Sequence, residues 1–277
     1  YHLKNSKINS PFVDLGCGDG TFSFTHFEGK CTTNFDVYRT MENPTDFFQG
    51  KDIHDTFSSV TPRITQNAKQ SISVGIDWKE NLLKKASKLK LYKKLIQHNL
   101  NDPLPLPDKY AKTIFSNIFY WIDDIEQLFR ESNRILDDKG KLILFLPDIN
   151  FKKNLLINRF SKKYDWVKFL DHDIAKNIGK HCYDYSKWKK IFSSNNFVIK
   201  NHSSYLSDSF VKFWTIGMRP YSPYFIEMAN SLEPKIRKKI KLKLIKEIAL
   251  IADSYVKYEI SSKSKNNCFH FFELEKQ

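Results

Sequence analysis

The stretch VDLGCGDGTFS, residues 13–23, decides how the rest of the chain is interpreted. The apolar segment 11–15 predicts a buried strand, and Gly16, Gly18 and Gly20 follow it on alternate positions before a predicted helix. A strand, a glycine-rich turn and a helix N-terminus bring bare backbone close to a ligand and point peptide N–H groups at it. No Gly-Lys-Ser/Thr sequence follows, which excludes a P-loop.

Apolar runs alternate with helical patterns along the chain. Further strands are predicted at 71–77, 95–99, 113–117, 139–147, 197–206 and 268–276. Helices are predicted at 19–27, at 78–95, at 123–136 with Asp123 or Asp124 as N-cap, and over most of 208–260. Continuous apolar strands are typical of a parallel sheet covered on both faces. We therefore expect an α/β fold with a seven-stranded, mostly parallel, Rossmann-like sheet and helices on both faces.

The chain is expected to form a single domain over residues 1–277, because it contains no internal repeat and no clean linker. Its parts are a core at 11–147, an insertion at about 27–70, an acceptor-side region at about 148–260 and a last strand at about 268–276.

The composition limits the possible partners. The net charge of +14 comes from 38 lysines and only 7 arginines, and arginine is the residue that best reads phosphate and guanine. A nucleic-acid partner is therefore allowed but not favoured. The four cysteines have no CxxC spacing, which favours a reducing, cytoplasmic setting. No apolar run is long enough to span a bilayer.

The segment VDLGCGDG resembles the first motif of the class I, Rossmann-like S-adenosylmethionine-dependent methyltransferases. Further segments resemble later motifs of this family in the same order: VGID, HNLNDPLPLPD, TIFSNIFYWIDD and LFRESNRILDDKGKLILFLP. Together the motifs cover residues 12–147. The resemblance implies S-adenosylmethionine as the cofactor and in-line displacement of its methyl group.

The resemblance also implies which residues surround the methionine part of the cofactor. Asp14 is expected near the methionine amino group, directly or through water. The turn made of Gly16, Cys17, Gly18 and Gly20 is expected to let the backbone approach the amino acid and the sugar.

Four polar or aromatic residues and a leucine complete the expected cofactor site. Asp77 ends the second strand, where its carboxylate can accept hydrogen bonds from ribose hydroxyls. Trp78 is expected to stack on the adenine, Asn99 and Leu100 to flank it, and Asn117 to lie where the methyl group points. Structural alternatives stay open: Asp77 as a helix N-cap, Trp78 as packing and Asn117 as a turn residue.

The absence of two motifs narrows the range of possible methyl acceptors. No [DN]-P-P-[YF] sequence follows the fourth strand, and no cysteine follows a proline, so methylation of nucleobase amino groups or of pyrimidine C5 is disfavoured. A small-molecule, sugar or lipid-type acceptor is favoured instead. His181 is the candidate general base. A metal site from Asp171, Asp173, His181 and Asp184 matches no strong spacing pattern, so no metal is expected.

One helix near the C-terminus is amphipathic. Its apolar face is expected to cover the core and consists of Ile236, Ile240, Leu244, Ile248 and Ile251. Peripheral contact of this face with a membrane surface is the alternative. Two other functions also remain open at this point. The positive charge suits an RNA methyltransferase, and the absence of an obvious base suits a binding protein that keeps the fold without catalysis.

Overall fold

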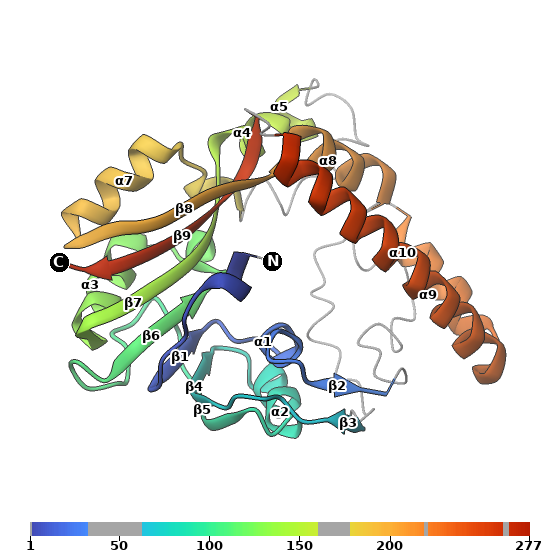
Figure 1. The fold of residues 1–277 in the computed structure, drawn as a ribbon, viewed down its shortest axis with the longest axis horizontal. Coiled ribbons are helices and arrows are strands. Elements are labelled where there is room, and N and C mark those ends of the chain that lie inside the picture. The colour runs from blue at the N-terminus through green and yellow to red at the C-terminus, as the bar shows by residue number, and fades with distance from the viewer. Residues whose placement is uncertain (1, 33–62, 160–177, 219–220, 263–265) are drawn as a thin grey trace.

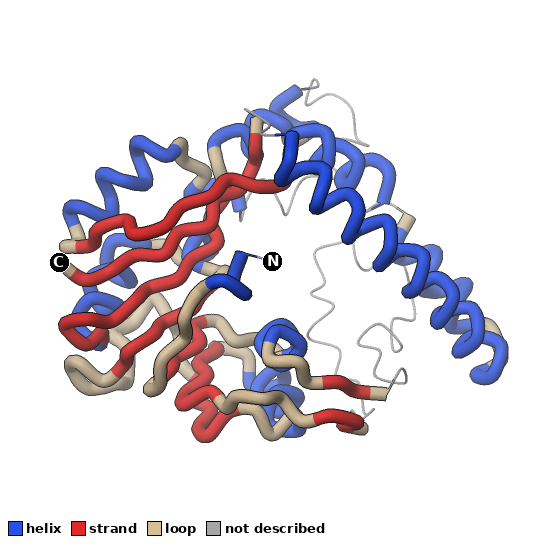
Figure 2. The backbone as a smooth tube through the Cα atoms, viewed as in Figure 1, coloured by secondary structure: helices blue, strands red, loops and turns tan. Residues whose placement is uncertain are grey.

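The computed structural model describes residues 2–32, 63–159, 178–218, 221–262 and 266–277. Seven strands form one sheet in the order β5-β4-β1-β6-β7-β9-β8 (Figures 1 and 2). β9 is antiparallel to both of its neighbours, and the other pairs are parallel. The strands are β1 Phe12–Leu15, β4 Ile72–Asp77, β5 Tyr92–Gln97, β6 Ala111–Ser116, β7 Leu136–Pro147, β8 Phe197–Ser207 and β9 Asn267–Lys276. The predicted Rossmann-like sheet is confirmed.

Helices connect the strands. They are α1 Thr21–His26, α2 Glu80–Lys88, α3 Ile125–Ile135, α4 Ile149–Asn154, α5 Leu156–Arg159, α7 Tyr185–Ser194, α8 Asp208–Lys212, α9 Ser222–Ser231 and α10 Pro234–Ser262. Shorter helical turns are η1 His2–Asn5, η4 Phe119–Trp121, η5 Ile178–His181 and the π-helical η6 Phe213–Met218. A separate antiparallel pair is formed by β2 Lys30–Cys31 and β3 Ile64–Gln66.

The hydrophobic core covers both faces of the sheet. Val13 and Leu142 belong to one buried cluster, whereas their strand neighbours Phe12 and Ile143 belong to another. Successive side chains of a strand point to opposite faces, so the two clusters pack on opposite sides of the sheet. This double burial explains why the strands read as continuous apolar runs.

The helix predicted at 78–95 is too long. α2 ends at Lys88, and β5 already begins at Tyr92. Lys90 has a φ of 52°, which breaks the helix, and the residues after it pair with β4. The helix predicted at 123–136 is present as α3, and Asp124 is its N-cap because its Oδ1 accepts a hydrogen bond from the backbone N–H of Gln127 at 2.9 Å.

The expected core role of the stripe on α10 is wrong. Its five residues, Ile236, Ile240, Leu244, Ile248 and Ile251, are 47–67% exposed. Figure 1 shows the reason: α10 extends away from the sheet instead of lying across it. No described helix is both long enough and apolar enough to cross a membrane.

Candidate active site

A cleft of about 630 Å³ opens where β1, β4 and β5 end. In open parallel sheets this edge, at the carboxyl ends of the strands, is where ligands bind. Six of the ten predicted cofactor-binding residues come together here: Gly16, Gly18, Asp77, Trp78, Asn99 and Leu100.

The glycine turn leaves part of this cleft wall without side chains. Gly16, Gly18 and Gly20 all have positive φ values, of 73°, 55° and 75°. A Cβ on Gly16 would lie 2.1 Å from Ile118, and one on Gly20 would lie 2.9 Å from Tyr92. A Cβ on Gly18 would meet nothing within 4 Å. The backbone at Gly18 is therefore open to a ligand in the cleft.

Asp77 is held in place by two backbone groups. Its Oδ2 accepts a hydrogen bond from the N–H of Gly18 at 2.9 Å, and its Oδ1 accepts one from the N–H of Lys79 at 3.0 Å. The side chain is nearly buried, and it still lines the cleft. Each carboxylate oxygen can accept a second hydrogen bond, so both can still receive hydroxyl groups of a ligand. The N-cap of α2 is Lys79 and not Asp77.

Trp78 and Asn99 follow the carboxyl ends of the neighbouring parallel strands β4 and β5, and both line the same cleft. Trp78 is 65% exposed, and the Nζ of Lys79 lies 5.2 Å from its ring centroid, so a planar ligand in the cleft could stack on the ring face away from Lys79. The side-chain oxygen of Asn99 accepts hydrogen bonds from the backbone and side-chain nitrogens of Asn101, both at 3.1 Å. This leaves the NH₂ group of Asn99 as the part that can bind a ligand.

Asp14 and Cys17 are buried and are not among the residues that line the cleft. The Oδ2 of Asp14 accepts hydrogen bonds from the hydroxyls of Ser23 at 2.6 Å and Tyr92 at 2.8 Å. Burial raises the pKa of Asp14 to about 6, the two hydrogen bonds lower it, and the charge of Asp77 adds to the increase. Burial also raises the pKa of the Cys17 thiol. The contribution of Cys17 to the turn comes from its backbone, whose N–H donates to the Ile76 carbonyl at 3.0 Å.

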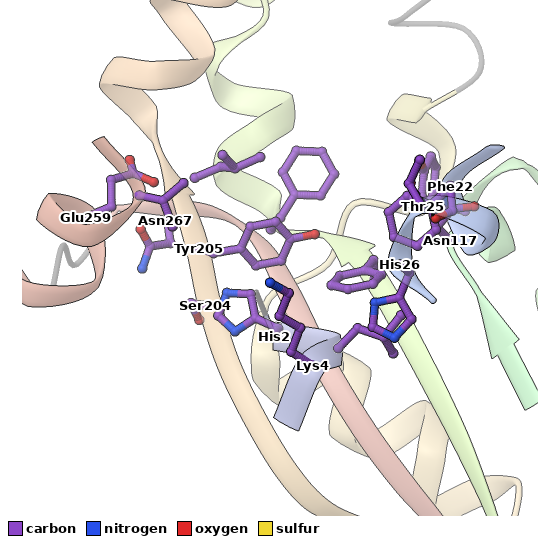
Figure 3. A pocket seen from close by; sticks show the side chains of 16 residues that line it. His2, Lys4, Phe22, Thr25, His26, Asn117, Ser204, Tyr205, Glu259 and Asn267 are labelled. Carbon is purple, nitrogen blue, oxygen red and sulfur yellow. Dashed lines mark hydrogen bonds between the residues drawn. The ribbon is translucent and has the colours of Figure 1, made fainter. Parts of the chain in front are cut away.

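A second cleft has a volume of about 540 Å³. The two clefts share no lining residue, but consecutive residues after β6 line them: Asn117 lines the second cleft and Ile118 the first. Figure 3 shows Asn117, Thr25 and Phe22 at one side of this cleft and Glu259 and Asn267 at the other. The phenylalanine and tyrosine rings that line it come from five different elements: Phe22, Tyr120, Phe145, Tyr205 and Phe269.

Two histidines and a lysine gather in the second cleft: His2, Lys4 and His26 (Figure 3). The Nδ1 of His2 is 2.9 Å from the hydroxyl of Ser203. His26, at the end of α1, is half-buried, and no side-chain hydrogen bond ties its ring to another described residue. Burial lowers the pKa of His26, and the positive charge of Lys4 lowers it further. At neutral pH this imidazole is therefore uncharged and carries a lone pair.

His181 lines neither cleft. Its Nε2 donates to the carbonyl of Ile122 at 2.9 Å, and its Nδ1 accepts from the hydroxyl of Tyr183 at 3.0 Å. Both nitrogens therefore hold the segment after η4 in place, and this geometry lends no support to the predicted role as a base.

Of the four candidate metal residues, the structure describes only His181 and Asp184. Asp171 and Asp173 lie outside the described residues, and Asp184 caps α7 by accepting from the N–H of Lys187 at 2.8 Å. Within the described ranges, no group of three or more His, Cys, Asp and Glu side chains is arranged to hold a metal ion.

The second cleft was not predicted from the sequence. Of its lining residues only Asn117 was singled out, as a cofactor-binding residue, because the others come from distant parts of the chain, such as His2, Tyr205 and Glu259. The one signal available was His26, a histidine at the end of the helix that follows the glycine turn.

Residues 58–144 match the family model described as a methyltransferase domain. Among curated protein sequences, none matches this chain. Solved structures with a similar fold include an S-adenosylmethionine-dependent methyltransferase from Mesorhizobium loti, with 13% identity, 96% of this chain and 90% of that chain covered, and a TM-score of 0.47. The geranyl diphosphate C-methyltransferase from Streptomyces coelicolor A3(2) has 11% identity, coverages of 100% and 74%, and a TM-score of 0.46. The MccD protein has 15% identity, coverages of 100% and 95%, and a TM-score of 0.48.

Proposed function

We propose that this chain, a class I S-adenosylmethionine-dependent methyltransferase, methylates a small-molecule, sugar or lipid-type acceptor held in the second cleft. The observation that supports this proposal is that consecutive residues after β6, Asn117 and Ile118, line the two clefts. Methyl transfer by in-line displacement needs donor and acceptor in adjoining sites, and positioning alone supplies a large part of the rate.

The first cleft fits S-adenosylmethionine. In this proposal the open backbone at Gly18 receives the amino-acid and sugar part, and the ribose hydroxyls donate to the oxygens of Asp77, each of which can accept a further hydrogen bond. Trp78, Leu100 and the NH₂ group of Asn99 are placed to hold the adenine. When bound, the cofactor supplies a methyl group on a positively charged sulfonium, which is an activated leaving group.

The second cleft fits a small, mainly apolar acceptor. Its volume of about 540 Å³ is in the range of small-molecule sites, and aromatic rings form much of its wall. An acceptor bound there would lie beside Asn117, at the side nearest the first cleft.

His26 is the general base in this proposal. It lines the acceptor cleft, it is uncharged at neutral pH, and its ring makes no side-chain hydrogen bond with another described residue. Its role is to accept the proton that an acceptor hydroxyl or amine loses as the methyl group arrives. Tyr205 is a weaker candidate because burial raises the pKa of its hydroxyl.

Replacement of His26 tests this assignment. His26→Asn should lower kcat by about 10²–10⁴-fold while S-adenosylhomocysteine still binds as tightly as to the wild type. In the wild type, kcat should fall as the pH drops through a value below 6.5, because protonation removes the lone pair. His181→Asn is the matched control: it should lower stability and leave kcat within a few-fold. An unchanged kcat in His26→Asn would refute the role of this residue.

The function itself is tested by two measurements. Calorimetry should detect S-adenosylhomocysteine binding, and Asp77→Ala should abolish it. Methyl-labelled S-adenosylmethionine should then label the small-molecule or lipid fraction of a cell extract. Tight binding without any label would favour a non-catalytic binding protein, and label in the RNA fraction would identify an RNA methyltransferase.

A further inference from the structure

The α9–α10 segment, residues 222–262, exposes large apolar side chains that the rest of the described chain does not cover. The stripe of Ile236, Ile240, Leu244, Ile248 and Ile251 is 47–67% exposed. α9 adds Tyr224, Phe225 and Met228, which are 46%, 63% and 64% exposed. Side chains of this kind in one continuous region mark an interaction surface.

The same segment is strongly cationic at its N-terminal end. Seven of the twelve residues at 235–246 are lysine or arginine, and none is acidic. On a helix, Ile236, Ile240 and Leu244 project from one side, whereas the exposed Leu242 and Ile245 project from the other, so apolar and basic side chains are interspersed around the whole helix. Long lysine side chains beside exposed apolar residues can extend to anionic headgroups while the apolar residues enter the membrane interface.

α10 is anchored at its other end, next to the second cleft. The Oε1 of Glu259 accepts hydrogen bonds from the N–H of Ser207 at 2.7 Å and from the hydroxyl of Tyr255 at 2.8 Å. The rings of Tyr255 and Phe210 lie 5.4 Å apart. Residues 234–254 extend beyond this anchor for about 30 Å at 1.5 Å per residue (Figure 1).

We propose that the α9–α10 segment docks this protein on a lipid surface that contains anionic headgroups. A nucleic acid would account for the lysines but would leave the isoleucines in water. A second copy of the chain would cover the isoleucines but would bring another cationic segment to the same place. An anionic membrane accounts for both features, because apolar side chains enter the acyl region while lysines extend to the headgroups.

The docked orientation has a consequence for the second cleft. Val256 and Glu259, near the anchored end of α10, line that cleft. A membrane bound along α10 would therefore lie close to the mouth of the acceptor site, which fits an acceptor taken from the lipid phase.

Vesicle flotation tests the proposal with the full chain. The protein should float with vesicles of phosphatidylcholine mixed with phosphatidylglycerol and not with phosphatidylcholine alone, and added salt should release it. Ile240→Glu with Leu244→Glu, and Lys239→Glu with Lys243→Glu, should each weaken binding by at least about tenfold. Lys189→Glu with Lys190→Glu on α7 makes the same change of charge elsewhere and should leave binding within about twofold. Circular dichroism of each variant should match the wild type.

Three results would overturn the proposal. The first is no flotation of the wild type with anionic vesicles, and the second is equal loss of binding in the α7 control. The third is a wild-type protein that binds no vesicles and forms a dimer in light scattering, with the dimer dissociated by Ile240→Glu with Leu244→Glu. That result would mean that a second copy of the chain covers this surface. This test needs no methyl transfer, so its failure would leave the proposed methyltransferase function intact.

Discussion

At the scale of single residues, Asp14 couples the stability of the fold to pH. Its carboxyl is buried, and its pKa in the folded protein is about 6 instead of the ordinary 3.8. The folded state therefore keeps a proton at pH values where the unfolded chain has released it. Stability from this group is highest below the unfolded pKa and falls as the pH rises from about 4 to about 6.

The substitution Asp14→Asn should remove this pH-dependent loss of folding stability. The substitution keeps an oxygen that can accept from Ser23 and Tyr92, and it has no charge to bury. In urea unfolding, the variant should gain roughly 2–3 kcal/mol over the wild type between pH 4 and pH 7, since each pKa unit corresponds to about 1.4 kcal/mol. A stability difference that does not change with pH would contradict the buried, protonated carboxyl.

The glycines of the turn allow binding to be separated from folding. Gly18→Ala adds a methyl group where nothing lies within 4 Å, so it should cost only about 1–2 kcal/mol for the left-handed backbone. It should nevertheless weaken S-adenosylhomocysteine binding by at least about tenfold, because the methyl group enters the cleft.

Gly20→Ala is the matched comparison for this experiment. Its methyl group would lie 2.9 Å from Tyr92, which holds Asp14, so this variant should lose more stability than Gly18→Ala. Thermal unfolding and calorimetry measure the two effects separately. Equal loss of stability in both variants, with unchanged affinity in Gly18→Ala, would show that Gly18 does not face the cofactor.

At the scale of elements, Arg134 on α3 secures the segment that follows β5. Its guanidinium donates to the carbonyls of Leu104 at 2.9 Å and Leu106 at 2.8 Å, and it pairs with Glu131 and Asp108. A lysine cannot make these bonds together, because its ammonium is a single point of charge. Arg134 thus has a structural role: it holds the segment that begins at Asn99, which lines the first cleft.

Arg134→Lys should destabilise the protein by about 2 kcal/mol in urea unfolding, because charged hydrogen bonds to two buried carbonyls are lost. Arg130→Lys on the exposed side of the same helix should change stability by less than about 0.5 kcal/mol. Equal effects of the two substitutions would refute the anchoring role of Arg134.

The elements also show what the sequence could predict. The strands were predicted because both faces of the sheet are buried, which makes the segment 142–147 continuously apolar and places Ile72, Val74 and Ile76 in the shorter segment 71–77. The end of α2 was not predicted correctly, because Leu89 and Leu91 continue the apolar pattern of the helix up to the start of β5. The stripe on α10 was assigned to the core because helical periodicity shows that a face is apolar but not what lies against it.

For the candidate site, the residues of the first cleft could be predicted from the sequence, whereas most residues of the second cleft could not. Residues of the first cleft follow directly after strands, so position in the chain was enough to bring Gly18, Asp77 and Asn99 together. The second cleft combines η1, β8, α10 and β9 with α1, and their neighbourhood depends on how the last two strands return to the sheet. Local sequence patterns do not predict that packing.

At the scale of the whole molecule, the described part of the chain is built on one sheet, and we propose that it unfolds as one unit. The two buried clusters lie on opposite faces of shared strands, so neither face can open without exposing the other. In scanning calorimetry, a single transition should appear, with equal calorimetric and van't Hoff enthalpies. S-adenosylhomocysteine at 100 times its Kd should stabilise the folded state by about 2.7 kcal/mol and move the whole transition upward by several degrees. Asp77→Ala should show the same single transition without the upward shift. Two transitions, of which the ligand moves only one, would mean that the cofactor-binding half folds separately from the strands that complete the acceptor cleft.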